Sequence, residues 1–246
     1  MGKGKNYALS VAFIMLFAGI FIMALPYIRQ WNFDRKADTL IDDYREWMEE
    51  QRDEAMESTG TDTKEKVLYL ADLYEAMQEY NREIYENKQE DFRDAWSYQS
   101  PSFELSDWGL KENMIGYINI PRMKVNLPIY LGATTENMKK GAVNLSQTSL
   151  PLGGENTNCV IAAHRGYSGA AMFREIEKLQ IGDEVTVTNL WETLSYKVVE
   201  TKVILPTDTQ EVLIQKGRDL VTLITCHPYR HNYQRYVVYC ERLENP

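Results

Sequence analysis

The uncharged run from Tyr7 to Ile28 constrains the architecture of this chain more than any other feature of the sequence. The hydrocarbon core of a bilayer takes a helix of about 20 mostly apolar residues, so the run is long enough to cross a membrane. A cleavable signal peptide has a shorter apolar region followed by small residues, whereas this run ends in Leu25-Pro26-Tyr27-Ile28-Arg29. We therefore expect residues 1–31 to form an uncleaved membrane anchor.

The charges beside the anchor predict its orientation. Lys3 and Lys5 precede it, while Arg29 follows it, and Arg35 and Lys36 are mixed with acidic residues. Because lysine and arginine favour the cytoplasmic side, we expect the N-terminus inside and the rest of the chain outside the cell, as a single-pass membrane protein. Three cysteines in the external part give no disulfide framework, and an odd thiol there is itself a hint of chemistry.

Residues 32–93 have a helical and strongly acidic pattern. Apolar residues recur at helix spacing at Leu40, Ile41, Tyr44, Trp47 and Met48, and again at Leu70, Leu73, Tyr74, Met77, Tyr80 and Ile84. We expect two helices with a break near Ser58-Thr59-Gly60. The apolar stripe is too irregular for sustained heptads, so it favours a solvated stalk that lifts the next domain off the membrane over a coiled coil. Most of the net charge of −9 lies here, and nothing indicates nucleic-acid binding.

Strand-like runs dominate the chain from residue 114 to residue 246. They are rich in β-branched and aromatic residues and cover 116–120, 125–131, 158–164, 184–189, 194–205, 220–226 and 235–240. Only short helical patterns intervene, such as the one at 169–179. Seven or eight strands over about 130 residues predict a mainly β fold, a closed or nearly closed barrel with an adequate core.

Three chemically complementary side chains stand at the ends of these runs: Cys226, His164 and Arg235. A nucleophilic cysteine needs a nearby imidazole or positive charge to favour its thiolate, and His164 can also protonate a leaving amine. When a thiolate attacks a carbonyl, a guanidinium and backbone N–H groups can stabilise the developing oxyanion. Arg235 fits the first of these roles, and the amide of His227 is a candidate for the second.

The cysteines and histidines of this region also have structural interpretations. A cysteine on an apolar strand is usually a small buried hydrophobe, which is what we expect for Cys159 and Cys240. Cys226 differs because polar turn residues follow it at once. His227 and His231 are competing bases, but His227 alternates to the other side of the strand and His231 falls in a loop. A zinc site at Cys226, His227 and His231 has no Cys-x-x-Cys or His-x-x-x-His pair in support, so we expect no metal and no organic cofactor.

The run Thr222-Leu223-Ile224-Thr225-Cys226 resembles the Thr-Leu-x-Thr-Cys signature of sortases, the membrane-bound cysteine transpeptidases of Gram-positive bacteria. The resemblance extends from about Met114 to Arg242 and includes, in the family's order, segments 115–121, 137–142 and 153–158. It implies a sortase β-barrel in which Cys226, His164 and Arg235 are the catalytic residues.

Residues 94–113 resemble the lid of class C sortases, the pilin polymerases, which follows a helical extension and covers the active site with an Asp-Pro-aromatic motif. The resemblance assigns Asp94 and Trp96 to that lid, with Ala95 where the family usually has proline, so this lid lacks the ring that fixes φ at that position. Asp107-Trp108 is a second candidate lid pair. In a further alternative, Trp96 packs the end of the helical extension against the barrel.

The resemblance also implies a reaction. Cys226 attacks the Thr-Gly carbonyl of a Leu-Pro-x-Thr-Gly-like sorting signal, His164 protonates the departing glycine amine, and Arg235 steadies the oxyanion. The ε-amino group of a pilin lysine then resolves the thioacyl enzyme. The expected partners are pilins or surface proteins that carry a C-terminal sorting signal, together with the acceptor lysine of a pilin subunit.

Three alternatives remain at this stage: a sortase that anchors proteins to peptidoglycan, a hydrolytic cysteine protease, and a non-enzymatic membrane-tethered scaffold. Many pilin polymerases continue into a C-terminal membrane helix, whereas this sequence stops at Pro246. Either the sequence is truncated, or the protein relies on its N-terminal anchor.

Overall fold

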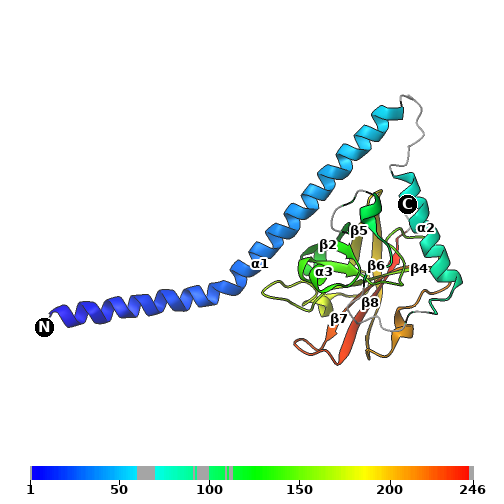
Figure 1. Cartoon of the computed structure of the whole chain (residues 1–246). Helices are drawn as coiled ribbons and strands as arrows, with labels where there is room; N and C mark the ends of the chain where they lie inside the picture. The colour runs from blue at the N-terminus through cyan, green and yellow to red at the C-terminus, as the bar shows by residue number, and fades with distance from the viewer. Residues whose placement is uncertain are drawn as a thin grey trace.

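A closed β-barrel forms the centre of the molecule (Figure 1). The computed structural model describes residues 2–59, 70–90, 92, 100–108, 110 and 113–243, and within them eight strands close in the order β1-β2-β3-β4-β7-β8-β6-β5. The strands are β1 (Met114–Ile120), β2 (Val125–Leu131), β3 (Ala142–Asn144), β4 (Thr157–Ala162), β5 (Glu184–Thr188), β6 (Thr193–Ile204), β7 (Asp219–His227) and β8 (Gln234–Arg242). The expected mainly β barrel is confirmed.

Two long helices, α1 (Gly2–Thr59) and α2 (Ala71–Glu86), lie outside the barrel (Figure 1). The short helices are α3 (Thr135–Lys140), η1 (Leu105–Trp108), η2 (Pro121–Met123), η3 (Ile176–Lys178) and η4 (Thr209–Val212). The helical pattern expected at 169–179 is wrong, since that segment contains turns and the single turn η3. Gly169 and Met172 have φ angles of +99° and +43°, which a right-handed helix does not allow.

Strands β4 and β7 are neighbours in the barrel, and most of their residues are buried. The two strands are parallel, with Val160 opposite Thr222 and Ile161 opposite Leu223. Strands buried on both faces are nearly continuous apolar runs, which explains the sequence of β7. Its one polar side chain at full burial, Thr222, donates a hydrogen bond of 2.7 Å to the Asn158 side chain on β4. The β4–β7 pair therefore supports the residues at the ends of these two strands.

The second half of α1 packs along the barrel, so the expectation of a stalk that lifts the domain off the membrane is wrong. Ile41, Tyr44 and Met48 are buried, and the Tyr44 hydroxyl donates to the Ile115 carbonyl over 2.9 Å. On α2, the Asn81 side chain bonds both the N–H and the carbonyl of Leu150. These apolar stripes are irregular because each faces a barrel and not another helix.

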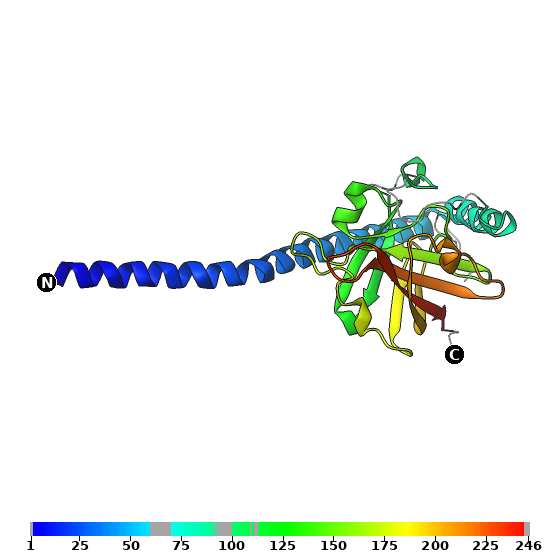
Figure 2. The ribbon, with the colours of Figure 1, turned by 90° about the horizontal axis from the view of Figure 1, so that it is seen from below.

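The first half of α1 is the apolar run, and it projects away from the barrel (Figure 2). Among the described residues, α1 is the helix long and apolar enough to cross a membrane, and the side chains of its apolar stretch are not buried in the fold. Where that stretch ends, α1 meets the loop after β4: the Gln30 side chain accepts a hydrogen bond from the Ala171 N–H, and Arg29 lies against Gly169. The helix thus reaches the barrel directly beyond its apolar part.

Candidate active site

The strand register brings the three predicted catalytic residues to one end of the barrel. Cys226 on β7 is the register partner of Arg235 on the antiparallel strand β8, and directly opposed side chains share a face of the sheet. On the other side of β7, Ala162 at the end of β4 is level with Ile224. The β4–β7 register stops there, two residues before His164 and Cys226. The residues that carry the thiol, the imidazole and the guanidinium therefore lie at or just beyond the ends of three neighbouring strands.

The three cysteines are all free, but they differ in burial. Cys159 and Cys240 are 3% and 0% exposed, and burial raises the pKa of each thiol far above its ordinary value. Both are small core residues, as expected. Cys226 is only half-buried, in contrast to the other two.

His164 lies in surroundings that favour the neutral imidazole. Partial burial lowers its pKa because the charged ring loses hydration. The ring stacks on Tyr167 with centroids 4.9 Å apart, and the His164 carbonyl accepts a hydrogen bond of 3.0 Å from the Phe173 N–H. A neutral, oriented imidazole suits a general base.

Arg235 is held by the loop between β7 and β8. Its Nη1 donates to the carbonyls of Asn232 and Gln234 at 2.7 and 2.9 Å. His231 lies in the same loop, is exposed, and has its ring 5.6 Å from that of Tyr233. These two contacts therefore hold one side of the guanidinium against the backbone at the start of β8.

His227 presents its ring on the face of the sheet opposite Cys226, as strand alternation predicts. The ring lies 5.7 Å from that of Tyr236, the residue after Arg235. The direction of the His227 N–H also follows from alternation. The Cys226 carbonyl faces the β4 side, where it accepts from Arg165, so the next N–H faces β8, where Gln234 is the register partner. An oxyanion role for the His227 amide stays a prediction.

Sequence reasoning missed a polar cluster behind the strand ends, formed by the buried Arg165, the partly buried His227 and the half-exposed Glu177. Arg165 Nη1 lies 2.7 Å from His227 Nδ1, and its Nη2 lies 2.8 Å from Glu177 Oε1. One signal for it was available: Arg165 follows His164, so alternation turns it to the face where His227 lies.

The lid candidates have different outcomes. Asp94, Ala95 and Trp96 lie outside the described residues. The second pair, Asp107-Trp108, is in η1, which is tied to the start of β1 through a hydrogen bond of 3.1 Å from the Leu105 N–H to the Asn113 side chain. The first residue of β1, Met114, pairs with Tyr130 near the end of β2. Trp108 is partly buried against the core, and a lid role for this pair stays a prediction.

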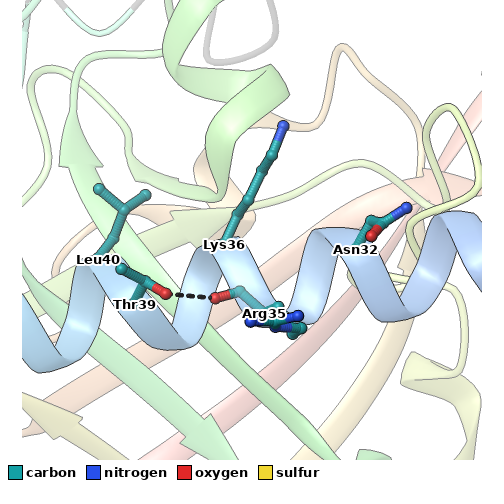
Figure 3. A pocket seen from close by; sticks show the side chains of 5 residues that line it. All are labelled: Asn32, Arg35, Lys36, Thr39 and Leu40. Atoms are coloured by element: carbon teal, nitrogen blue, oxygen red, sulfur yellow. Dashed lines mark hydrogen bonds between the residues drawn. The ribbon is translucent and has the colours of Figure 1, made fainter.

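A groove on α1 lies apart from the strand ends (Figure 3). It has a volume of about 480 Å³ and is lined by Asn32, Arg35, Lys36, Thr39 and Leu40, which all come from one helix. The Thr39 hydroxyl donates to the Arg35 carbonyl over 2.8 Å, which is a contact within the helix. This lining contains no cysteine and no histidine, and we assign it no role in catalysis. Among the residues that the structure describes, no group of three or more His, Cys, Asp and Glu side chains is arranged to hold a metal ion.

Comparisons with known proteins agree with this geometry. A family model described as "Sortase domain" matches residues 118–243. Sortase A of Bacillus anthracis is 30% identical over 166 residues, which are 67% of this chain and 77% of that protein. Sortase C of Streptococcus pneumoniae is 29% identical with a TM-score of 0.62, over 84% of this chain and 97% of that one. A lid mutant of Streptococcus agalactiae sortase C1 is 32% identical with a TM-score of 0.62, over 70% and 88%.

Proposed function

Because this chain belongs to the sortase family of cysteine transpeptidases, we propose that Cys226 is its nucleophile, His164 its acid and base, and Arg235 its oxyanion-stabilising cation. The supporting observation is the register, which pairs Cys226 with Arg235 and, between β4 and β7, ends at Ala162 opposite Ile224, two residues before His164 and Cys226. The substrate is a Leu-Pro-x-Thr-Gly-like sorting signal that is cut between threonine and glycine.

In the first half of the reaction, the Cys226 thiolate attacks the threonine carbonyl carbon and forms a tetrahedral oxyanion beside Arg235. The C–N bond to glycine then breaks, and the glycine nitrogen takes a proton from the His164 imidazolium. In the second half, an amine attacks the thioester carbonyl and gives up a proton to neutral His164. The C–S bond breaks, an amide bond forms and the thiolate is restored. Burial lowers the pKa of His164, which favours the base form that this second half needs.

The acceptor amine that we propose is the ε-amino group of a pilin lysine, so that the product is an isopeptide bond between pilins. Two features support this choice. The solved neighbours include class C enzymes, and the S. pneumoniae structure is described as informing pilin substrate specificity. In addition, helices α1 and α2 precede the barrel, as the helical extension of class C enzymes does.

A second candidate is anchoring of surface proteins to peptidoglycan, which the 30% identity to sortase A of B. anthracis favours. The test offers the full-length protein, in detergent, a sorting peptide together with equal amounts of a pilin and a peptidoglycan-precursor amine. Mass spectrometry of the product should find the threonine carbonyl on a pilin lysine, with no product from Cys226→Ala. Transfer to the precursor amine would favour anchoring, and free acid in spite of abundant amine would indicate a hydrolytic protease.

We also propose that Asp94 and Trp96 form a lid over the thiol, in residues 94–113 between the helical extension and the barrel. Sortase C1 of S. agalactiae has a lid, as its lid mutant shows. Labelling of Cys226 by a small thiol reagent should become faster in Trp96→Ala. Trp108→Ala tests the second candidate pair in the same assay, since Trp108 packs against the barrel core. An equal labelling rate in the two variants and the unmodified chain would argue against a shielding lid.

Helix α1 is proposed as a single-pass anchor, with residues 1–31 in the membrane and the catalytic domain, residues 114–246, outside the cell. In intact cells, a membrane-impermeant thiol reagent should then modify Cys226. N-terminal sequencing of the protein from washed membranes should recover the start of the chain. A mature N-terminus beyond Ile28 would identify the apolar run as a cleaved signal.

A further inference from the structure

The backbone ladder between β4 and β7 stops just before the two residues whose separation matters most for the chemistry. Its register pairs run from Thr157–Asp219 to Ala162–Ile224, and a backbone hydrogen bond of 3.3 Å follows from the Ala163 N–H to the Ile224 carbonyl. Beyond that point, side chains make the cross-links that the structure describes. These are a bond of 2.7 Å from the Thr225 hydroxyl to the Ala163 carbonyl and one of 3.4 Å from Arg165 Nη1 to the Cys226 carbonyl.

Arg165 is fixed from several sides at once. Its side chain is 5% exposed, and it contacts the Cys226 carbonyl, His227 Nδ1 and Glu177 Oε1. A buried guanidinium is costly unless it is paired, and its planar fork makes each contact directional. His227 Nδ1 lies 2.7 Å from Arg165 Nη1, and arginine only donates hydrogen bonds. Glu177 Oε1 lies 3.1 Å from the same Nδ1, which brings all three groups together.

The position of Arg165 in the chain gives these contacts a meaning. Arg165 follows His164 directly, and its guanidinium contacts the Cys226 carbonyl. This contact therefore connects the segment that carries the proposed base to the strand that carries the proposed nucleophile. The side chain lies on the face of the sheet opposite His164 and is almost fully buried, so it does not reach the reacting atoms. Glu177 on η3 anchors it from outside the sheet.

We propose that Arg165 is a positioning residue for the transpeptidase reaction, which holds the sulfur of Cys226 and the imidazole of His164 at their working separation. The proposal rests on the roles assigned above to those two residues. A displacement of about 1 Å between reacting groups can cost about 100-fold in rate, which gives such a cross-link a large effect on turnover.

The test measures cleavage of a sorting peptide by the full-length protein in detergent. For Arg165→Gln, kcat should fall roughly 10- to 100-fold. KM should change little, because Arg165 makes no contact with the peptide. Arg165→Lys should recover part of kcat, because it keeps the charge and one donor but not the fork.

The matched control is Arg218→Gln. Arg218 precedes β7, at the other end of the same strand, and its Nε pairs with Glu241 at 2.9 Å. This variant also loses an ion pair next to β7, but its kcat should stay near that of the unmodified chain. If both arginine variants are folded by circular dichroism and have equal kcat, the positioning role is rejected.

A second variant decides the matter if Arg165→Gln does not fold. Glu177→Gln removes the outer anchor of Arg165 at a half-exposed site, and it should lower kcat a few-fold. Its control is Glu175→Gln, which removes an exposed pair with Lys178 on the same turn. Equal kcat in these two glutamate variants would overturn the proposal.

A chemical readout separates positioning from simple loss of structure. In Arg165→Gln and Glu177→Gln, the rate of Cys226 alkylation at a fixed pH should fall, because the sulfur loses its fixed imidazole. The two controls should alkylate like the unmodified chain, and identical rates in all five proteins would reject the proposal. Cys226→Ala tests the assigned roles separately: if it still cleaves the peptide, those roles fail whatever Arg165 does.

Discussion

The two ends of strand β7 are both polar, yet they are built differently. At the first end, the Asp219 carboxylate accepts hydrogen bonds from the Gly154 N–H at 2.7 Å and the Tyr196 hydroxyl at 3.2 Å. At the last end, Cys226 lies half-exposed opposite Arg235. The first end is a closed network that joins neighbouring segments, whereas the second keeps a reactive atom open. The difference teaches that a polar strand end is structural where its groups satisfy one another, and available for chemistry where one group is left accessible.

Burial acts on the titrating groups of the two ends in opposite directions. It raises the pKa of Asp219, although the Gly154 N–H and Arg242 act against the rise. At the other end, burial lowers the pKa of His164. In both cases the charged form loses hydration, so each group shifts toward its neutral form. In the proposed reaction, only the neutral form of His164 has a chemical role, as a base.

The largest expected effect on the reaction is that of removing His164, the proposed base. His164→Ala should lower kcat for peptide cleavage by about 100- to 10,000-fold, the usual range for loss of a general acid and base. Its thermal unfolding should change little, because the ring is half-buried and its stacking on Tyr167 is a surface contact. A variant with normal kcat would show that another group, such as His231, is the base.

The three cysteines show the same contrast between accessible and closed groups. In the native protein, iodoacetamide should modify Cys226 and leave Cys159 and Cys240 unmodified, because their thiols are buried and their pKa values are raised. Peptide mapping by mass spectrometry checks this, and denaturant should make all three react. Modification of Cys240 without denaturant would contradict the closed barrel.

At the first end of β7, a substitution should cost stability and not chemistry. Asp219→Ala removes an acceptor from Gly154 and Tyr196, so it should lower the free energy of unfolding by about 1–3 kcal/mol. Chemical denaturation measures the loss. Activity per folded molecule should stay unchanged, and a loss of kcat larger than the unfolded fraction explains would mean that the two ends are coupled.

The smallest expected effect is a pH dependence of stability. Since the pKa of His164 is lower in the folded chain than its unfolded value of 6.5, the unfolded state binds the proton first as the pH falls. The contribution of His164 to the free energy of unfolding is therefore complete above pH 6.5. It is lost as the pH falls from 6.5 to the lower pKa of the folded chain. His164→Gln should flatten the slope of unfolding free energy against pH in that window. An unchanged slope would mean that the ring is as hydrated in the folded chain as in the unfolded one.

The barrel could be predicted because its strands carry local signals. Runs such as 220–226 are long, apolar and β-branched, and polar residues follow them at once. Strand β3 has three residues, too few to show a period, and it was missed. The segment 169–179 looked helical by composition, but positive φ angles at Gly169 and Met172 are set by the fold around it.

The candidate site was predictable to the extent that its residues stand at strand ends. The pairing that joins them was not, since β4 and β7 are separated by some 60 positions and no local pattern selects their parallel register. For the same reason the contact of Arg165 with Cys226 and His227 could not be predicted. The stalk expectation failed because a helical stripe does not say which partner it packs against.

The contact of Gln30 and Arg29 with the loop after His164 has a consequence for how a substrate arrives. With the apolar part of α1 in a bilayer, this contact brings the loop to the level of the lipid headgroups, on the side of the barrel that α1 meets. A protein tethered in the same bilayer would then find the enzyme by lateral diffusion, in a two-dimensional search. We expect the tether length beyond the cleavage site to set the efficiency of capture, with short tethers preferred over long ones.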